Sequence, residues 1–200
     1  LRPHQEKAIK AMSKHNKGQV IVPTGGGKTI CMIQDAIEQF KSDRLKTIVV
    51  VAPRILLANQ LCEEFLEFID DVDVLHVHSG ETHHQSTTNS KVIEEWYWAS
   101  KKHQLIFTTY HSLHKIQDAT AMLPDTVYFD EAHNAVQKNF IEAVEHHSMY
   151  VVRNYFFTAT PKHSFTPFKT GMNDTDIFGG VICNVGAPKL VKQGLSLIHI

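Results

Sequence analysis

Short apolar segments rich in Val, Ile and Phe recur along the chain, separated by longer stretches in which apolar residues return with helical spacing. The short segments are nearly continuous rather than alternating, which is typical of strands buried on both faces of a parallel sheet. We expect strands at residues 19–23, 46–53, 72–78, 104–110, 126–132 and 154–160.

The intervening stretches have the pattern of amphipathic helices, in which apolar residues three and four positions apart share one face. Two such faces are expected: Ile30, Ile33, Ile37 and Phe40 in the first helix, and Ala58, Leu61, Phe65 and Phe68 in the second. Strands that alternate with helices predict a doubly wound α/β fold, a mostly parallel sheet between two helix layers.

The length of 200 residues and the 42% hydrophobic content suit one well-packed domain. From about residue 161 the pattern changes to Pro, Gly, Thr and Asn, which favours a loop and then a connector. The chain begins with Leu1 and ends in "LSLIHI", so we expect a fragment of a longer protein.

Charge and cysteine content exclude some classes of protein. With 20 basic and 21 acidic residues, the chain has no global basic field of the histone type, although a local phosphate-contacting strip remains possible. The three cysteines fit neither a disulfide framework nor a C-x-x-C knuckle, which favours an intracellular, reducing compartment. No apolar run approaches the roughly 20 residues of a membrane span, so we expect a soluble protein without a membrane partner.

The stretch "VPTGGGKT" lies between an expected strand and an expected helix. At such a turn, successive backbone N–H groups and a helix N-terminus converge on one spot, which suits phosphate oxygens. Lys28 would reach the β and γ phosphates, and the Thr29 hydroxyl would bind Mg²⁺. The strict phosphate-loop pattern has a glycine where this chain has Val22.

An Asp-Glu pair follows the expected strand in "VYFDEAHNA". Ligands of open parallel sheets gather at the carboxyl ends of the strands. Asp130 there could hold Mg²⁺, and Glu131 could orient and deprotonate an attacking water. Alone, such a pair is usually a solvated loop or a helix cap, but downstream of a phosphate loop it is the expected metal and base partner.

The motifs "LRPHQ", "PTGGGKT", "DEAH" and "FTATP", in this order, resemble the glutamine motif and motifs I, II and III of superfamily 2 helicases. The similarity is to their first RecA-like domain, in the group that includes DEAH-type proteins, repair translocases and type III restriction subunits. Motif I of this superfamily commonly lacks the first glycine, so Val22 fits it. The resemblance implies a RecA-like P-loop NTPase domain over residues 1–165, and a connector over residues 166–200 toward a second RecA-like domain.

The resemblance also implies a set of functional residues. Catalytic roles fall to Lys28, Asp130 and Glu131, and Mg²⁺ to Thr29 and Asp130. ATP binding falls to Arg2, Gln5, Pro23, Thr24, Gly25, Gly26, Gly27, Lys28 and Thr29, where Gln5 would read the adenine edge. Without the other motifs, Gln5 would be taken for an ordinary surface residue near a helix start.

Further positions follow from the same resemblance. His133, Thr158 and Thr160 would couple the nucleotide site to domain movement, or the two hydroxyls would merely cap the exit of a strand. Pro53, Arg54, Thr108 and Thr109 would meet the backbone of a nucleic acid, although such residues at strand ends are mostly structural.

The implied function is that of an ATP- and Mg²⁺-dependent helicase or translocase acting on nucleic acid, with DNA favoured over RNA. The alternative is an ATP-responsive subunit that gates an interaction or a nuclease, as in restriction complexes. In this superfamily an arginine of the second RecA-like domain completes the nucleotide site. Without such a finger turnover falls by about 10³–10⁵-fold, so we expect this chain alone to bind nucleotide poorly and to hydrolyse ATP slowly.

Fourteen histidines are present, several of them in "HVHSGETHH" at residues 76–84. This segment contains neither H-E-x-x-H nor a Cys-His spacing typical of zinc sites. The sequence pattern therefore predicts no metal site apart from Mg²⁺.

Overall fold

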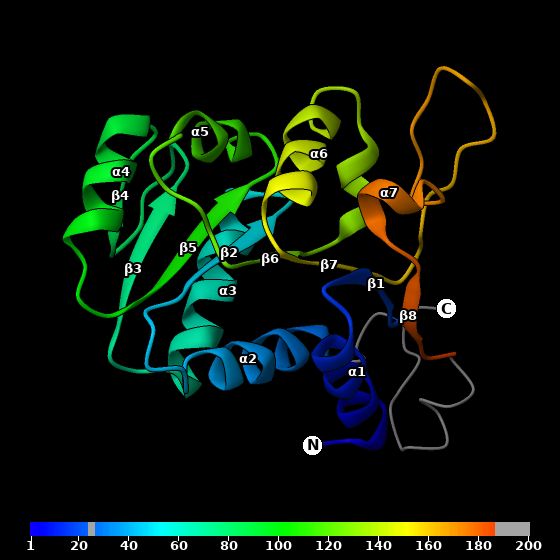
Figure 1. Ribbon diagram of the computed structural model, residues 1–200, viewed down its shortest axis with the longest axis horizontal. Coiled ribbons are helices and arrows are strands. Elements are labelled where there is room, and N and C mark those ends of the chain that lie inside the picture. Colours follow the sequence, from blue (N-terminus) through cyan, green and yellow to red (C-terminus); the bar gives the residue numbers. More distant parts are fainter. Residues whose placement is uncertain (24–26, 187–200) are drawn as a thin grey trace.

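A single sheet runs through the computed structural model, which describes residues 1–23 and 27–186 (Figure 1). Its strands are β1 (Lys17–Ile21), β2 (Thr47–Ala52), β3 (Val72–Val77), β4 (Gln85–Ser86), β5 (His103–Thr109), β6 (Thr126–Phe129), β7 (Arg153–Thr158) and β8 (Val181–Asn184). They lie in the order β4-β3-β5-β2-β6-β7-β1-β8, and every paired strand is parallel to its neighbour. The predicted α/β fold with a parallel sheet is confirmed.

Helices cover both faces of the sheet (Figure 1). One layer contains α1 (Pro3–Lys14), α2 (Lys28–Gln39) and α3 (Ile55–Phe68). The other layer contains α4 (Ser90–Ala99), α5 (Leu113–Asp118), the 3₁₀ helix η1 (Ala132–Val136), α6 (Ile141–Tyr150) and α7 (Thr175–Phe178). The three-layer arrangement predicted from the sequence is thus present.

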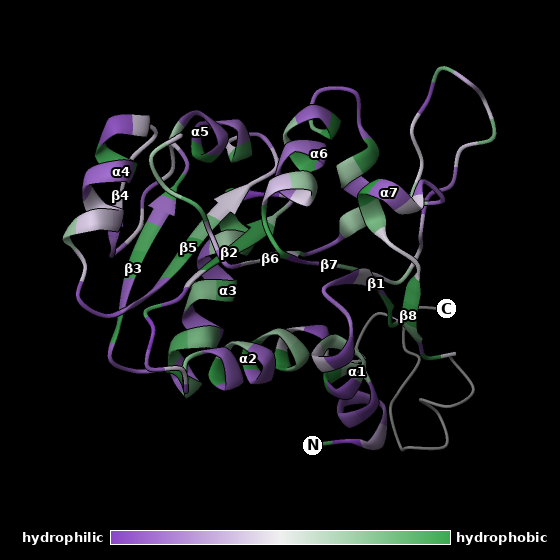
Figure 2. Ribbon diagram, viewed as in Figure 1, coloured by the Kyte–Doolittle hydropathy of each residue, from purple (hydrophilic) through white to green (hydrophobic). Residues whose placement is uncertain are grey.

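Each central strand contributes to two hydrophobic cores. In β2, Ile48 and Val50 pack in the core beneath α1, α2 and α3, whereas Val49 and Val51 pack in the core beneath the other helices. Both faces of the strand are therefore buried, which explains why its sequence is continuously apolar. Figure 2 shows β2 largely in the hydrophobic colour, whereas the helices carry both colours.

The predicted helix faces agree with the structure except at one residue. Ile33 of α2 is fully buried, and the other three predicted residues of this helix are partly buried against the same core. In α3, Phe68 is 53% exposed, so its assignment to the buried face was wrong. The helix ends at Phe68, and the extended Ile69 that follows is buried instead.

The segment after β7 contains more regular structure than the sequence pattern suggested. After a loop, α7 leads into β8, which pairs with β1 at the edge of the sheet. Gln19 of β1 anchors the approach to β8 because its side-chain amide donates to the carbonyls of Met172 (2.7 Å) and Gly179 (2.9 Å). The sheet therefore continues to Asn184, while the domain boundary at residue 165 stays a prediction.

A buried ion pair ties α2 to the amino ends of β6 and β7. Both guanidinium nitrogens Nη1 and Nη2 of Arg153 donate to the carboxylate of Asp35, at 2.9 and 2.7 Å. The Tyr128 hydroxyl donates to the same carboxylate, and Arg153 also donates to the Thr126 hydroxyl at 3.1 Å.

None of the described helices has the length and apolar character needed to cross a bilayer.

Candidate nucleotide site

The turn from β1 to α2 places a helix N-terminus at the carboxyl ends of the parallel strands. Gly27 is the N-cap of α2 and has a φ of +79°, in the left-handed region that favours glycine. The conformation therefore favours glycine, and a Cβ at this position would lie 2.2 Å from Nε2 of Gln5 and displace that amide. Lys28 and Thr29 form the first turn of the helix, while Thr24, Gly25 and Gly26 lie outside the described residues.

The predicted adenine-reading residue lies directly beside this turn. Gln5 is only 7% exposed, and its Oε1 accepts the backbone N–H of Arg2 at 2.9 Å. That bond directs the carbonyl end of the amide to the N-terminal backbone and leaves the amino end against Gly27. Arg2 itself is exposed, and Pro23 is partly exposed at the end of β1.

Lys28 meets both acids of the "DEAH" segment. Its Nζ contacts Oε1 of Glu131 and lies 3.8 Å from Oδ1 of Asp130. Asp130 directly follows β6, and its backbone is fixed by the Tyr110 hydroxyl, which donates to the Asp130 carbonyl at 2.6 Å. Glu131 has a φ of +47°, a left-handed conformation that is uncommon for a non-glycine residue and that Asp71 shares in this chain.

Asp130 is a carboxylate held in an unfavourable environment. It is 8% exposed, and its Oδ1 is buried without a hydrogen-bond partner among the residues that the structure describes. Burial raises the pKa of Asp130 to about 6, and this effect outweighs the opposing influence of Lys28. A buried carboxylate oxygen of this kind is suited to receive a cation.

The predicted coupling residues are in contact with one another. His133 Nδ1 lies 2.8 Å from the Thr158 hydroxyl at the end of β7, and the same hydroxyl accepts the backbone N–H of Thr160 at 3.1 Å. His133 Nδ1 also lies 3.7 Å from Oε2 of Glu131. Burial lowers the pKa of His133, so the ring is neutral near pH 7. A polar connection thus runs from Glu131 through His133 to the exit of β7.

Two of the predicted nucleic-acid contacts are occupied inside the sheet. The Thr108 side chain is fully buried and donates to the carbonyl of Val77 at 2.7 Å. Thr109 is 4% exposed, and its hydroxyl accepts the backbone N–H of Ser112 at 3.2 Å. These bonds fix the ends of β5 and the following turn, so the geometry favours the structural role that the sequence had left open.

The other two predicted contacts lie on the surface. Arg54 is exposed at the N-cap of α3, and Pro53 is partly exposed just before it. Within residues 1–23 and 27–186, the Arg54 side chain makes no hydrogen bond or ion pair. It remains available to a phosphate.

Sequence reasoning did not identify Tyr110, which positions Asp130. The residue follows the two threonines of β5, and its ring is buried against Phe129 and Phe140. A tyrosine at the end of an apolar strand is normally interpreted as a core residue. Only the fold shows that the Tyr110 hydroxyl reaches past β2 to the end of β6.

The chain is similar to known proteins both in sequence family and in fold. The model of the family "Type III restriction enzyme, res subunit" matches residues 1–163. No curated protein gave a significant sequence match.

Three solved structures illustrate the similarity in fold. A nuclease-deletion mutant of the Type ISP restriction-modification enzyme LlaGI, in complex with a DNA substrate mimic, has a TM-score of 0.80 at 22% identity over 97% of this chain and 20% of its own. The ATP-dependent Type ISP enzyme LlaBIII bound to DNA has a TM-score of 0.78 at 20% identity over 97% of this chain and 16% of its own. The Hef helicase domain of Pyrococcus furiosus has a TM-score of 0.69 at 20% identity over 96% of this chain and 40% of its own.

The chain therefore spans less than half of each of these proteins. The family match, in contrast, covers most of the chain and includes every predicted motif. This chain belongs to the family of type III restriction enzyme res subunits, and its fold is similar to that of the Hef helicase domain.

Proposed function

We propose that this domain binds ATP with Mg²⁺ and forms one half of a motor site whose parent protein moves along DNA. One observation carries the proposal: Lys28, Asp130 and Glu131 converge at a helix N-terminus, and Asp130 keeps a buried oxygen without a hydrogen-bond partner among the described residues. A lysine, two acids and the N-terminal backbone N–H groups of a helix, all at the carboxyl ends of parallel strands, suit a nucleoside triphosphate and its metal.

The side chains divide the work by their chemistry. Lys28 and the N-terminal N–H groups of α2 are placed to bind phosphate oxygens, and Gln5 is placed to hydrogen-bond the base. Thr29 and Asp130 offer the oxygen ligands that Mg²⁺ prefers. When bound, Mg²⁺ neutralises charge on the phosphates.

Glu131 is the candidate base. Its carboxylate is paired with Lys28, so it can accept a proton from a water only after Lys28 has turned toward a phosphate. His133 then connects Glu131 to Thr158 and Thr160. A change at the acid can thereby be transmitted to the segment that leaves β7.

DNA is proposed as the track because Arg54 is exposed at the same edge of the sheet, and because two of the similar structures are of restriction-modification enzymes with DNA or a mimic of it. Contacts to phosphates read no base sequence, as movement along any strand requires. A second RecA-like domain of the parent is expected to supply the arginine that raises turnover by about 10³–10⁵-fold.

A second candidate is an ATP-responsive subunit of a restriction complex that translocates or gates a nuclease without separating strands. The same two neighbours favour it. Strand-displacement and triplex-displacement assays on the parent distinguish the candidates, since a helicase releases the annealed strand and a translocase removes only the third strand.

The test is ATP turnover of the full-length parent with single-stranded DNA, duplex DNA and RNA. We expect DNA to stimulate turnover and both Lys28→Ala and Glu131→Gln to abolish the stimulation. Lys41→Ala is the matched control, because Lys41 lies just after the same helix, α2, in an exposed pair with Glu38. Turnover that survives both substitutions, or that falls as much in the control, would contradict the assignment.

A further inference from the structure

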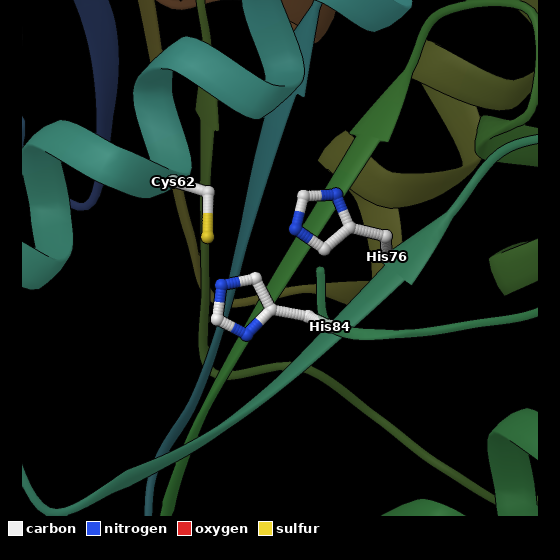
Figure 3. A group of neighbouring side chains, drawn as sticks. All are labelled: Cys62, His76 and His84. Atoms are coloured by element: carbon white, nitrogen blue, oxygen red, sulfur yellow. The ribbon is translucent and has the colours of Figure 1, made fainter. Parts of the chain in front are cut away.

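Three side chains from separate elements gather at the opposite end of the sheet from the candidate nucleotide site. Cys62 of α3, His76 of β3 and His84 of the loop before β4 have ligand atoms that all lie within 4.8 Å of one another. Figure 3 shows the thiol and the two rings around a common space. Cys62 and His76 are buried, and His84 is partly exposed.

His76 has a buried ring nitrogen without a partner. The backbone N–H of Gly80 donates to Nδ1 of His78 at 3.1 Å, so neutral His78 carries its proton on Nε2. His78 Nε2 lies 3.0 Å from Nδ1 of His76 and donates to it. His76 is fully buried, and its Nε2 has no hydrogen-bond partner among the residues that the structure describes.

Figure 3 places this unpartnered nitrogen on the side of the His76 ring that faces Cys62 and His84. A buried polar atom is normally satisfied. Its orientation toward a thiol and a second imidazole indicates a ligand that all three groups would share.

The cluster is separate from the motor site. Between β3 and β1 lie β5, β2, β6 and β7. Five strand spacings of about 4.8 Å amount to about 24 Å. The cluster is instead next to β5 and to α3, the helix that begins directly after Arg54.

We propose that Cys62, His76 and His84 form a Zn²⁺ site with water as the fourth ligand. One thiolate and two imidazoles suit Zn²⁺ in a tetrahedral geometry, whereas Mg²⁺ and Ca²⁺ prefer oxygen ligands. The three groups border a cavity of about 910 Å³, whose wall also includes Asn59, Glu63 and Thr82. This space accommodates the water on the open side of the ion.

Binding requires defined changes in protonation. The Cys62 thiol releases its proton to solvent as the sulfur binds the ion. His76 must carry its ring proton on Nδ1 and donate it to Nε2 of His78, which is the usual arrangement behind a metal-bound histidine. His78 then carries a proton on Nδ1 and gives up the hydrogen bond from Gly80.

Binding also requires movement of His84. The His76 and His84 rings are now stacked, with centroids 5.6 Å apart and planes at 10°. A metal ion lies in the plane of each ring that binds it, so the partly exposed His84 ring must turn until the planes converge. Zn²⁺ would thus fasten segment 79–84 to α3, close to the candidate DNA contact.

The test uses the chain freed of metal by a chelator and titrated with Co²⁺ as a spectroscopic substitute for Zn²⁺. We expect the visible bands of tetrahedral Co²⁺ together with the near-ultraviolet charge-transfer band of a Co²⁺–thiolate bond, at one ion per chain, and loss of the bands on adding Zn²⁺. Cys62→Ser should remove the thiolate band. His84→Ala should weaken Zn²⁺ binding by at least the 10–100-fold seen when a supporting residue is lost.

His83→Ala is the matched control, because His83 is the adjacent histidine in the same cavity wall and lies outside the cluster. It should leave binding unchanged. Circular dichroism checks that each variant is folded, and the partly exposed His84 provides a variant expected to fold even if Cys62→Ser does not. The proposal is overturned if the native chain gives no thiolate band, if the band survives Cys62→Ser, or if His83→Ala and His84→Ala weaken binding equally.

Discussion

Two clusters, each of which combines acidic and basic side chains, lie at opposite ends of the strands. At the amino edge, Asp35 and Arg153 are fully engaged: two guanidinium nitrogens and the Tyr128 hydroxyl meet both oxygens of the carboxylate. At the carboxyl edge, Lys28 also approaches two acids, but Oδ1 of Asp130 is buried without a hydrogen-bond partner in the described part of the chain.

The difference separates a structural ion pair from a binding site. A buried carboxylate whose two oxygens both accept hydrogen bonds is already stabilised without a ligand, so its removal lowers the stability of the fold. A buried carboxylate with an oxygen that accepts no hydrogen bond is unfavourable by itself, and a bound cation would stabilise it. The extent of hydrogen bonding, more than the presence of charge, therefore indicates which cluster has a function.

Removing the acid of the structural cluster should have the largest effect. Asp35→Ala leaves the Arg153 guanidinium buried beside Tyr155 without its carboxylate, so the free energy of unfolding should fall by about 3–5 kcal/mol. Urea denaturation of the chain measures it. Glu38→Ala on the same helix removes an exposed pair with Lys41 and should change stability by less than about 1 kcal/mol. Equal losses in the two variants would remove the distinction between buried and exposed pairs.

Asp130→Asn, in contrast, should lower ATP turnover without lowering the stability of the fold. Turnover of ATP by the parent should fall on the order of 10²–10³-fold, as when a charge-stabilising group is removed. The free energy of unfolding of this chain should stay the same or rise by about 1–2 kcal/mol, because a buried charge with an unsatisfied oxygen is replaced by a neutral amide. Turnover assays and urea denaturation give the two values. A variant that is clearly less stable than the native chain would place Asp130 with the structural cluster.

A third buried titratable group, His147, resembles the structural cluster because a backbone carbonyl already satisfies one of its ring nitrogens. Its Nδ1 lies 2.8 Å from the carbonyl of Ala143, and burial lowers the pKa of His147 to about 4. The unfolded chain, with a pKa near 6.5, binds the proton more readily, so the stabilisation is complete above about pH 6.5 and is lost as the pH falls toward 4. The loss should be about 3 kcal/mol.

Urea denaturation at several pH values checks this, with His147→Asn as the comparison because its amide can still donate to Ala143. The variant should lose less stability than the native chain between pH 6.5 and 4. Parallel pH profiles would show that other groups cause the acid sensitivity.

The fold could be predicted wherever burial acts on both faces of a segment. The continuous apolarity of β2, and the shorter apolar runs at residues 105–107 of β5 and 155–157 of β7, follow directly from the two cores. Prediction failed at Phe68, because helical spacing continues past the point where the chain turns away from the core. It also missed β8, a strand of four residues in a region rich in glycine and asparagine, whose place depends on pairing with β1.

The candidate sites differ in the same way. Lys28, Asp130 and His133 belong to local motifs that keep a fixed relation to a strand end, so their convergence followed from the order of motifs and the parallel sheet. Asp35 and Arg153 are 118 positions apart and carry no motif. The histidine-rich segment likewise contained no zinc spacing, because its third ligand, Cys62, comes from a different element.

The smallest expected effect concerns Arg54, an exposed charge that belongs to neither cluster. If it contacts one phosphate, Arg54→Ala should weaken DNA binding by the parent less than about tenfold and lower the slope of log affinity against log salt by about 0.7–0.9. Fluorescence anisotropy at several salt concentrations measures both. Arg44→Ala is the control, because Arg44 is also exposed but lies at the amino end of β2. Arg44 is paired there with Asp125, whose side chain also accepts the backbone N–H of Thr47. An unchanged slope for Arg54→Ala would contradict the DNA contact proposed for Arg54 without affecting the proposed nucleotide site.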